Sequence, residues 1–205
     1  MGDKLTDDVL AAFVALDPVM AGLAERHGPP RLGGRRTGGT RFEQLAEAIC
    51  YQQLTGKAAA TIWGRVRALA GGAFTPEAVL GIAPEALRAA GLSGAKTASL
   101  LDLAAKAADG TVRLDRIGRL ADDEVVAHLT VVRGIGPWTA EMFCVFTLGR
   151  LDVWPVGDYG VRAGWAKAYG LPALPSPKEL AVLGERFRPY RTLAAWYCWR
   201  ATEEA

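Results

Sequence analysis

The chain has 205 residues, half of them hydrophobic, and a formal net charge of +2 at pH 7. A chain of this length and composition buries a real core, in one domain or two small lobes, and is too apolar to be disordered. The small net charge does not by itself indicate a nucleic-acid partner. We recognise no signal peptide and no apolar run long enough to span a membrane, so we expect a cytoplasmic protein without a membrane partner.

The three cysteines, Cys50, Cys144 and Cys198, lie far apart in segments with helical spacing. This distribution is typical of reduced core thiols in a cytoplasmic protein. It excludes a cysteine cluster for zinc or for an iron–sulfur centre. His27 and His128 show no ligand spacing, so we interpret both as structural or exposed residues.

Arginines gather in two parts of the chain. One group crowds a loop rich in glycine and proline, and the other lies near the C-terminus: Arg26, Arg31, Arg35, Arg36 and Arg41, then Arg186, Arg188, Arg191 and Arg200. For any single one of them, a solvated surface position is the better interpretation.

Helical spacing and capping signals cover almost the whole chain. We predict helices over 6–16 and 17–27, one after the Thr40/Glu43 capping box, and one over 55–69. Two short helices begin at Thr75 and Ala83, a long one begins at Ser93, and Asp115 and Asp122 cap the next two. Further helices are predicted over 137–148, 158–169, 176–186 and 189–202. We expect a loop over 28–39, a short extended piece over 111–114 and an all-α fold.

Two features of this prediction concern the core. In the long helix, the predicted buried face is Ala98, Leu101, Ala105 and Ala108. Trp63 and Trp165 lie in the middle of helices, where filling the core is the preferred interpretation.

The most informative segment runs from Leu129 to Ala140, with the sequence LTVVRGIGPWTA. It predicts the end of one helix, a tight turn with glycines at 134 and 136, and a second helix that begins at Pro137. Free N–H groups at such a helix start bind phosphate. Gly-x-Gly turns between helices are also common in plain packing. The added Trp138-Thr139-Ala140, Asp158 and Arg162 favour a nucleic-acid site.

The segment and the carboxylate after it resemble the helix-hairpin-helix DNA glycosylases, closest to the 3-methyladenine glycosylase II branch. The resemblance covers roughly residues 40–202. Further matching pieces are Phe42-Glu-Gln-Leu, Gln52-Gln-Leu-Thr55, Gly91-Leu-Ser93 with Lys96, Asp152-Val-Trp-Pro155, and Arg188-Pro-Tyr-Arg191 with Trp196 and Trp199. Some members carry an extra N-terminal β domain, which we do not expect here.

The resemblance implies two helical lobes, with the hairpin motif and an active site in the cleft between them. We expect residues 1–205 to form one glycosylase unit. One lobe is expected to comprise about 1–40 plus 155–205, and the other about 41–154.

Asp158 is the expected catalytic residue. As a base leaves deoxyribose, C1′ becomes cation-like, and a fixed carboxylate stabilises that charge and can orient or deprotonate the attacking water. Nearby N–H groups at the predicted helix start favour its ionised form. The alternative is that Asp158 is only an N-cap. Asp152 is the competing carboxylate, and its context suggests that it fixes a loop.

Trp138 occupies the position at which bifunctional members of the family carry a lysine that forms a Schiff base. We therefore expect no lyase activity. Aromatic rings also stack on cationic alkylated purines. The resemblance places Trp138, Trp199, Tyr159 and Met142 in the base pocket, where Met142 stands in place of a tyrosine. Weaker pocket candidates are Trp154, Trp196 and Tyr197.

Base flipping leaves a hole that a wedge must fill. The resemblance assigns this role to Gln53 and Leu54, although Leu54 would equally suit a buried contact between helices. Gly134, Gly136, Thr139 and Arg162 are the expected phosphate-binding residues. By resemblance alone, the main-chain carbonyls of Thr130, Val132 and Ile135 bind a structural K⁺ or Na⁺ ion. No other cofactor is expected, and in particular no iron–sulfur cluster.

We therefore predict a monofunctional DNA glycosylase of base excision repair. It would flip out and hydrolyse alkylated purines of the 3-methyladenine and 7-methylguanine type, acting as a monomer on damaged double-stranded DNA. Two alternatives stay open. One is a non-catalytic helix-hairpin-helix module that binds DNA, and the other is a glycosylase for another damaged base.

Overall fold

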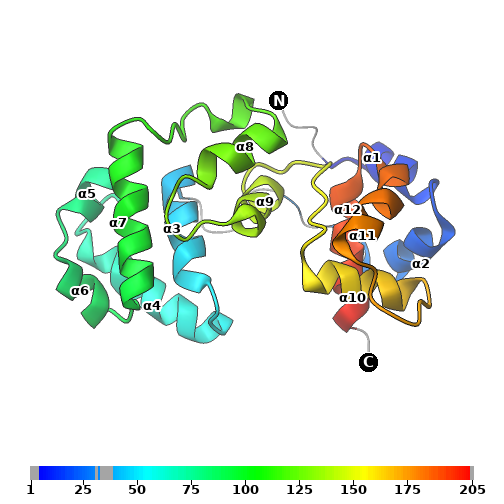
Figure 1. Cartoon of the computed structure of the whole chain (residues 1–205), viewed down its shortest axis with the longest axis horizontal. Coiled ribbons are helices and arrows are strands. Elements are labelled where there is room, and N and C mark those ends of the chain that lie inside the picture. The colour runs from blue at the N-terminus through cyan, green and yellow to red at the C-terminus, as the bar shows by residue number, and fades with distance from the viewer. Residues whose placement is uncertain (1–4, 31, 33–38, 204–205) are drawn as a thin grey trace. The chain divides into compact units, whose positions relative to one another are not determined.

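A computed structural model describes residues 5–30, 32 and 39–203. All the regular structure in these ranges is helical, which confirms the predicted all-α fold (Figure 1). Arg31, Arg35 and Arg36 of the first arginine group lie outside the described residues. In the described part of the chain, no helix is long and apolar enough to cross a membrane.

The chain divides into two compact units. The first combines residues 1–34 with 144–205, and the second comprises 35–143. Helix α9, Pro137–Phe146, contains the boundary between them.

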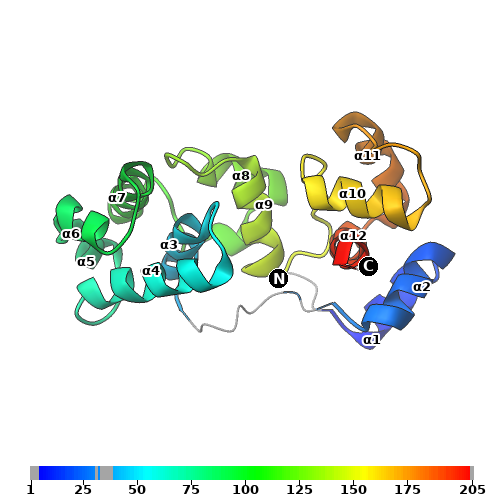
Figure 2. The same cartoon turned by 90° about the horizontal axis from the view of Figure 1, so that it is seen from below.

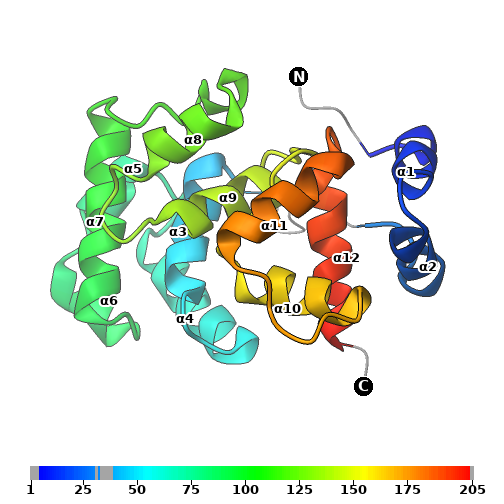
Figure 3. The same cartoon turned by 45° about the vertical axis from the view of Figure 1, so that its right-hand side comes forward.

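Within its described residues, the first unit contains five further helices and one 3₁₀ turn. These are α1 (Asp7–Val14), α2 (Pro18–His27), α10 (Tyr159–Ala168), α11 (Pro177–Gly184), η2 (Glu185–Phe187) and α12 (Arg191–Glu203). Asp17 Oδ1 caps α2 by accepting from the Val19 and Met20 N–H groups, as its place before Pro18 suggested. Helices α1 and α2 lie side by side (Figure 3).

Helix α12 forms the centre of the first unit, and α10 crosses it closely (Figure 2). Gly164 makes this crossing possible, because a Cβ there would lie 1.8 Å from the Cys198 carbonyl oxygen. Large side chains are fully buried around the crossing, namely Phe13, Trp165, Phe187 and Tyr197. Trp165 is therefore a core residue, as predicted.

The second unit is built from α3 (Arg41–Tyr51), α4 (Gly56–Leu69), α5 (Pro76–Leu80), α6 (Pro84–Ala89), α7 (Gly94–Ala108), η1 (Ile117–Arg119), α8 (Asp122–Leu129) and most of α9. Helix α7 packs against α5 and α3 (Figure 1). Trp63 is buried, as predicted, and its ring meets Phe74 edge-on with centroids 5.0 Å apart.

Three local predictions need correction. Thr40 caps α3, but the Glu43 carboxylate pairs with Arg67. Asp122 is the first residue of α8, and the Glu124 carboxylate accepts the Ala121 N–H at 2.7 Å. The buried face of α7 is formed by Thr97, Ser99, Leu100, Leu103 and Ala104, one position away from the predicted alanine face.

The boundary expected at 154/155 also differs from the structure, which groups residues 144–154 with the terminal segments. The reason lies in the contacts of Thr192 on α12. Its N–H donates to the Leu151 carbonyl at 2.9 Å, and its hydroxyl donates to the Arg150 carbonyl at 2.8 Å. The same hydroxyl accepts the Val153 N–H at 2.8 Å. These bonds hold the segment before α10 on α12.

Candidate active site and nucleic-acid interface

The predicted hairpin connects α8 to α9. Val132 and Ile135 are buried and anchor the turn, and the Ile135 N–H donates to the Val132 carbonyl at 3.1 Å. Gly134, Gly136 and Pro137 are exposed. The turn therefore keeps its apolar side chains inside and presents glycine backbone and a helix start to solvent, which is the arrangement required for a phosphate.

Glycine occupies the two hairpin positions for different structural reasons. Gly134 has a φ of +76°, and a Cβ there would lie 2.3 Å from the Ser99 hydroxyl oxygen on α7. The fold therefore requires glycine at 134. A Cβ on Gly136 would meet nothing within 4 Å. The second glycine leaves open space on the exposed side of the turn, where a ligand can approach the backbone.

A carboxylate on α7 holds the hairpin from within its own unit. Asp102 Oδ2 accepts the Arg133 N–H at 2.7 Å, and Asp102 Oδ1 pairs with Lys106. Burial would raise the pKa of Asp102, but the hydrogen bonds from Lys106 and from the Arg133 N–H outweigh it and lower that pKa. The ionised carboxylate thus fixes the chain just before the glycines.

The expected wedge residues lie in the turn between α3 and α4. Gln53 has a φ of +56°, a conformation that non-glycine residues seldom adopt. Leu54 is 40% exposed. This exposure argues against the alternative of a buried interhelical contact and leaves the side chain available to a ligand.

Asp158 precedes α10 and is 9% exposed. Its Oδ1 accepts two hydrogen bonds, from the Val161 N–H at 2.8 Å and from the Trp199 indole Nε1 at 3.0 Å. The first bond makes Asp158 the N-cap of α10. Capping and catalysis are compatible, because a cap fixes the direction of the carboxylate without removing its charge.

Trp199 lies on α12 beside this carboxylate. Its ring stacks on Phe146, with centroids 5.7 Å apart and planes 27° apart. Gly160 leaves room for the indole, because a Cβ there would lie 2.9 Å from Trp199 Cδ1 and 3.1 Å from Asp158 Oδ1. Neither Phe146 nor Gly160 was expected from the sequence to belong to the site. A glycine two residues after the candidate carboxylate was the available signal.

The other predicted site residues divide between the two units. In the first, Tyr159 is 70% exposed, and Arg162 Nε donates to the Pro175 carbonyl at 2.8 Å. In the second, Trp138 is 50% exposed, Met142 is half-buried, and Thr139 is buried with its hydroxyl 3.4 Å from Gln52 Nε2. The structure thus gathers Asp158 with Trp199 in one unit, and the hairpin with the wedge turn in the other.

Two of the weaker pocket candidates are core residues. Trp154 is buried and its Nε1 donates to the Leu180 carbonyl at 2.8 Å. Tyr197 is fully buried and its hydroxyl donates to the Gly28 carbonyl at 3.0 Å. Trp196 is half-buried, with the Arg200 guanidinium 5.2 Å from its ring centroid.

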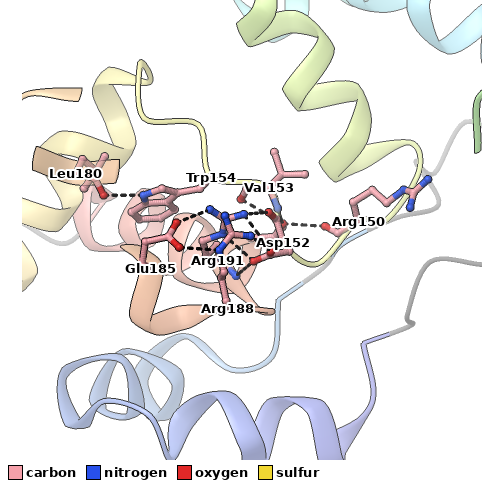
Figure 4. Close-up of polar contacts among 9 residues, drawn as sticks. Arg150, Asp152, Val153, Trp154, Leu180, Glu185, Arg188 and Arg191 are labelled. Atoms are coloured by element: carbon pink, nitrogen blue, oxygen red, sulfur yellow. Dashed lines mark hydrogen bonds and ion pairs between the residues drawn. The ribbon is translucent and has the colours of Figure 1, made fainter. Parts of the chain in front are cut away.

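Asp152 forms a network with the C-terminal arginines (Figure 4). Its carboxylate accepts from Arg191 Nε at 2.8 Å and from Arg188 Nη1 at 2.9 Å, and Glu185 contacts both arginines. Asp152 therefore fixes the loop, as its context suggested.

The C-terminal arginine group is not simply solvated surface. Besides the two arginines on Asp152, Arg186 pairs with Asp17 at 3.1 Å and Arg200 pairs with Glu203 at 2.7 Å. These arginines hold helix ends and loops of their own unit.

The cysteines and histidines agree with their structural interpretation. Cys50, Cys144 and Cys198 are buried free thiols, and burial raises the pKa of Cys50 to about 12. His128 Nε2 accepts the Arg113 N–H at 2.8 Å. Within the described residues, no group of three or more histidine, cysteine or acidic side chains is arranged to hold a metal ion.

The all-α fold, the exposed glycine hairpin and the carboxylate fixed at the start of α10 are the features that the resemblance to DNA glycosylases led us to expect. Residues 46–189 match the family model described as HhH-GPD superfamily base excision DNA repair protein. The chain belongs to this family.

Individual relatives match this chain over most of their length. DNA-3-methyladenine glycosylase 1 of Schizosaccharomyces pombe is 36% identical over 167 residues, which are 80% of this chain and 73% of the relative. A crystal structure of a DNA-3-methyladenine glycosidase from Bacillus halodurans matches with a TM-score of 0.85 at 35% identity, over 97% of this chain and 91% of that one. The S. pombe 3-methyladenine DNA glycosylase in complex with abasic DNA matches with a TM-score of 0.83 at 32% identity, over 97% and 98%.

Proposed function

We propose that this protein is a monofunctional DNA glycosylase that flips alkylated purines out of double-stranded DNA and hydrolyses their glycosidic bond. The observation that carries the proposal is Asp158, a buried carboxylate whose Oδ1 is held by the Val161 N–H and the Trp199 indole. The names of the related proteins support the substrate class. We expect the protein to act as a monomer.

The chemistry follows from the charge that develops as the base leaves. Deoxyribose C1′ becomes cation-like, and a carboxylate whose direction is already fixed stabilises it without reorganising at that moment. The same carboxylate can orient the attacking water or accept its proton. Because Asp158 is held by a backbone N–H and by an indole N–H, it needs no rearrangement before the reaction.

The leaving group explains why one carboxylate suffices. An alkylated purine such as 3-methyladenine is already cationic, so its departure depends less on a general acid. Trp138 and Tyr159 present exposed aromatic surface, and aromatic faces favour cationic bases. These two residues, with Trp199 and Met142, are the proposed contacts to the extruded base.

Lyase activity is not expected, because it needs an amine that attacks C1′. Trp138 stands where bifunctional relatives carry that amine. Burial lowers the pKa of the Lys96 ammonium, which would favour a nucleophile. However, Lys96 Nζ donates to the Cys50 carbonyl at 2.9 Å and to the Gln52 carbonyl at 2.6 Å. Borohydride should therefore fail to trap the protein on damaged DNA, and a trapped complex would contradict the monofunctional mechanism.

The proposed roles in binding DNA follow the exposure of each segment. The hairpin with Gly134 and Gly136 would hold a backbone phosphate, together with Thr139 and Arg162, and Gln53-Leu54 would fill the hole left by the flipped base. The carbonyls of Thr130, Val132 and Ile135 are neutral oxygen donors that fit a monovalent cation such as K⁺. The Val132 carbonyl accepts one N–H and keeps a second lone pair for the ion, which would stiffen the hairpin.

The competing function is DNA binding without catalysis, which the capping bond from the Val161 N–H to Asp158 favours. Incubation with dimethyl-sulfate-treated DNA separates the two. The proposed enzyme releases free 3-methyladenine or 7-methylguanine, whereas a binding module releases neither. Release of a deaminated or oxidised base alone would instead assign the chain to another lesion.

A further inference from the structure

A lysine from α7 holds the end of α3 and the start of the wedge turn. Lys96 Nζ donates to the carbonyls of Cys50 and Gln52, at 2.9 and 2.6 Å. Both carbonyls belong to the last turn of α3 and its cap, where a cation is favoured by the helix dipole and by otherwise unpaired carbonyl oxygens. The amine therefore fixes the residue immediately before Gln53 and Leu54.

The side chain of Gln52 connects the same turn to the hairpin. Its Nε2 donates to the Gly134 carbonyl at 3.0 Å and lies 3.4 Å from the Thr139 hydroxyl oxygen. Gly134 lies before Pro137 and Thr139 lies after it, so one amide reaches both sides of the predicted phosphate site. All these residues belong to the second unit.

Among the described residues, few other contacts fix the direction of the wedge turn. Leu54 N–H reaches the Tyr51 carbonyl at 3.3 Å, and residues 53–58 are exposed. Gln53 adopts its positive φ without the conformational freedom of glycine. A strained and exposed turn keeps such a conformation only where its surroundings impose it, and Lys96 and Gln52 supply those contacts.

We propose that Gln52 and Lys96 are positioning residues for base extrusion, which hold the wedge turn at a fixed distance from the phosphate-binding hairpin. This inference rests on the proposed function. The hydrogen bonds of Gln52 and Lys96 form a link between the wedge turn and the hairpin. When the hairpin holds a phosphate, this link presents Leu54 to the base stack at a set spacing from that phosphate. Neither residue touches the reacting atoms, and their effect reaches the reaction only through the wedge.

A positioning role of this kind has a specific consequence. The wedge is needed only where a base must leave a stacked and paired duplex. A lesion that is already unpaired in a bubble does not need it, although the catalytic carboxylate acts on both substrates. Loss of the link should therefore slow excision from a duplex and leave excision from a bubble close to the parental rate.

The test uses one 7-methylguanine placed in a duplex or in a bubble of the same sequence. Gln52→Ala and Lys96→Met should each lower the duplex-to-bubble ratio of excision rates about tenfold, as expected when one or two net hydrogen bonds are lost. Lys96→Arg should restore much of that ratio. Gln44→Ala is the matched control, because Gln44 Nε2 donates to the Gly39 carbonyl at the same 3.0 Å without touching the hairpin. Gln44→Ala should leave the ratio unchanged.

A second measurement does not depend on catalysis. 2-Aminopurine placed beside an abasic-site analogue brightens when the wedge unstacks it. Parental protein should give this signal, and Gln52→Ala should lose most of it at saturating protein. A melting curve of each variant is the control for its folding.

The outcomes separate the two hypotheses. Equal losses on duplex and bubble, or a ratio and an unstacking signal that stay parental, would overturn the positioning role while leaving the proposed activity intact. Absence of base release by the parental protein on both substrates would overturn the proposed function. In that case, the unstacking signal alone would test whether Gln52 and Lys96 position the wedge turn.

Discussion

Asp152 and Asp158 lie six residues apart on the segment before α10, yet their partners differ. Asp152 forms ion pairs with two guanidinium groups, those of Arg188 and Arg191. Asp158 Oδ1 accepts from two neutral donors, the Val161 N–H and the Trp199 indole. A guanidinium compensates the charge of a carboxylate, whereas a neutral N–H orients the carboxylate and adds no positive charge.

The hydrogen-bond donors of the two carboxylates suit them to different roles, one structural and one chemical. Asp152 is paired with arginines and holds the chain onto α12, and the two guanidinium groups compensate most of its negative charge. The two N–H groups on Oδ1 fix the direction of the Asp158 carboxylate, which suits its proposed role of stabilising a cation that forms beside it. Substitutions that remove the charge from each carboxylate should therefore have different effects.

The largest expected effect is that of Asp158→Asn. The amide keeps an oxygen that accepts from Val161 N–H and Trp199, but it has no negative charge for the sugar cation. Excision of 7-methylguanine should fall by about 10²–10³-fold, as for other preorganised charges at a transition state. Single-turnover kinetics measure the loss. Binding to an abasic-site duplex and the melting curve should stay near the parental values, and near-parental excision would remove Asp158 from the mechanism.

Asp152→Asn should act on stability instead. The substitution removes one of the two carboxylates that pair with Arg191, whose side chain is only 14% exposed, and leaves it with the exposed Glu185 alone. A loss of about 2 kcal/mol in the free energy of unfolding is expected, between the values for exposed and for buried pairs. Urea unfolding measures it, and Asp115→Asn, at an exposed acid beside Arg113, is the control with a smaller effect. If folded Asp152→Asn protein lost excision activity as strongly as Asp158→Asn, the assignment of a purely structural role to Asp152 would be wrong.

The helices, the hairpin and the helix start at Asp158 could be predicted from the sequence because their signals are local. Caps such as Asp17, the prolines that open helices, and glycines 134 and 136 specify the backbone over a few residues. The bonds that distinguish Asp152 from Asp158 join residues about 40 positions apart, between the α10 segment and α12. Helical periodicity carries no information about which distant donor meets which carboxylate.

The error on α7 has a related cause. This helix is rich in alanine, so several of its faces are nearly equal in hydrophobicity, and the tertiary neighbours decide which face is buried. Ser99 lies against Gly134, and Asp102 binds the Arg133 N–H. Two polar residues are thus oriented toward the hairpin by contacts more than thirty residues away in sequence.

Gly160→Ala tests how far the direction of Asp158 matters. The added Cβ would lie 2.9 Å from Trp199 Cδ1, so the indole must shift and its bond to Asp158 Oδ1 must lengthen. Because misplaced catalytic groups lose rate without losing charge, excision should fall about tenfold. Stopped-flow excision and indole fluorescence report the two changes together. Parental excision with a displaced indole would show that Trp199 does not position the carboxylate.

Trp199→Phe gives the smallest expected effect and separates two roles of the indole. Phenylalanine keeps an aromatic ring next to Phe146 but removes the Nε1 donor that reaches Asp158 at 3.0 Å. The loss of one net hydrogen bond, about 1 kcal/mol, should slow excision about fivefold. A melting curve must accompany the kinetics, since a substitution in a half-buried position can also lower stability.

The choice of lesion in the Trp199→Phe experiment separates a role in orienting Asp158 from a role in stacking on the extruded base. If Trp199 acts through Asp158, cationic 7-methylguanine and a neutral base that the enzyme also excises should slow by the same factor. If the ring stacks on the extruded base, the two lesions should respond differently, because only a cationic base gains from the negative face of the ring and indole is the stronger cation–π partner. A larger loss on the cationic lesion would therefore assign Trp199 to the base pocket, and equal losses would assign it to the carboxylate.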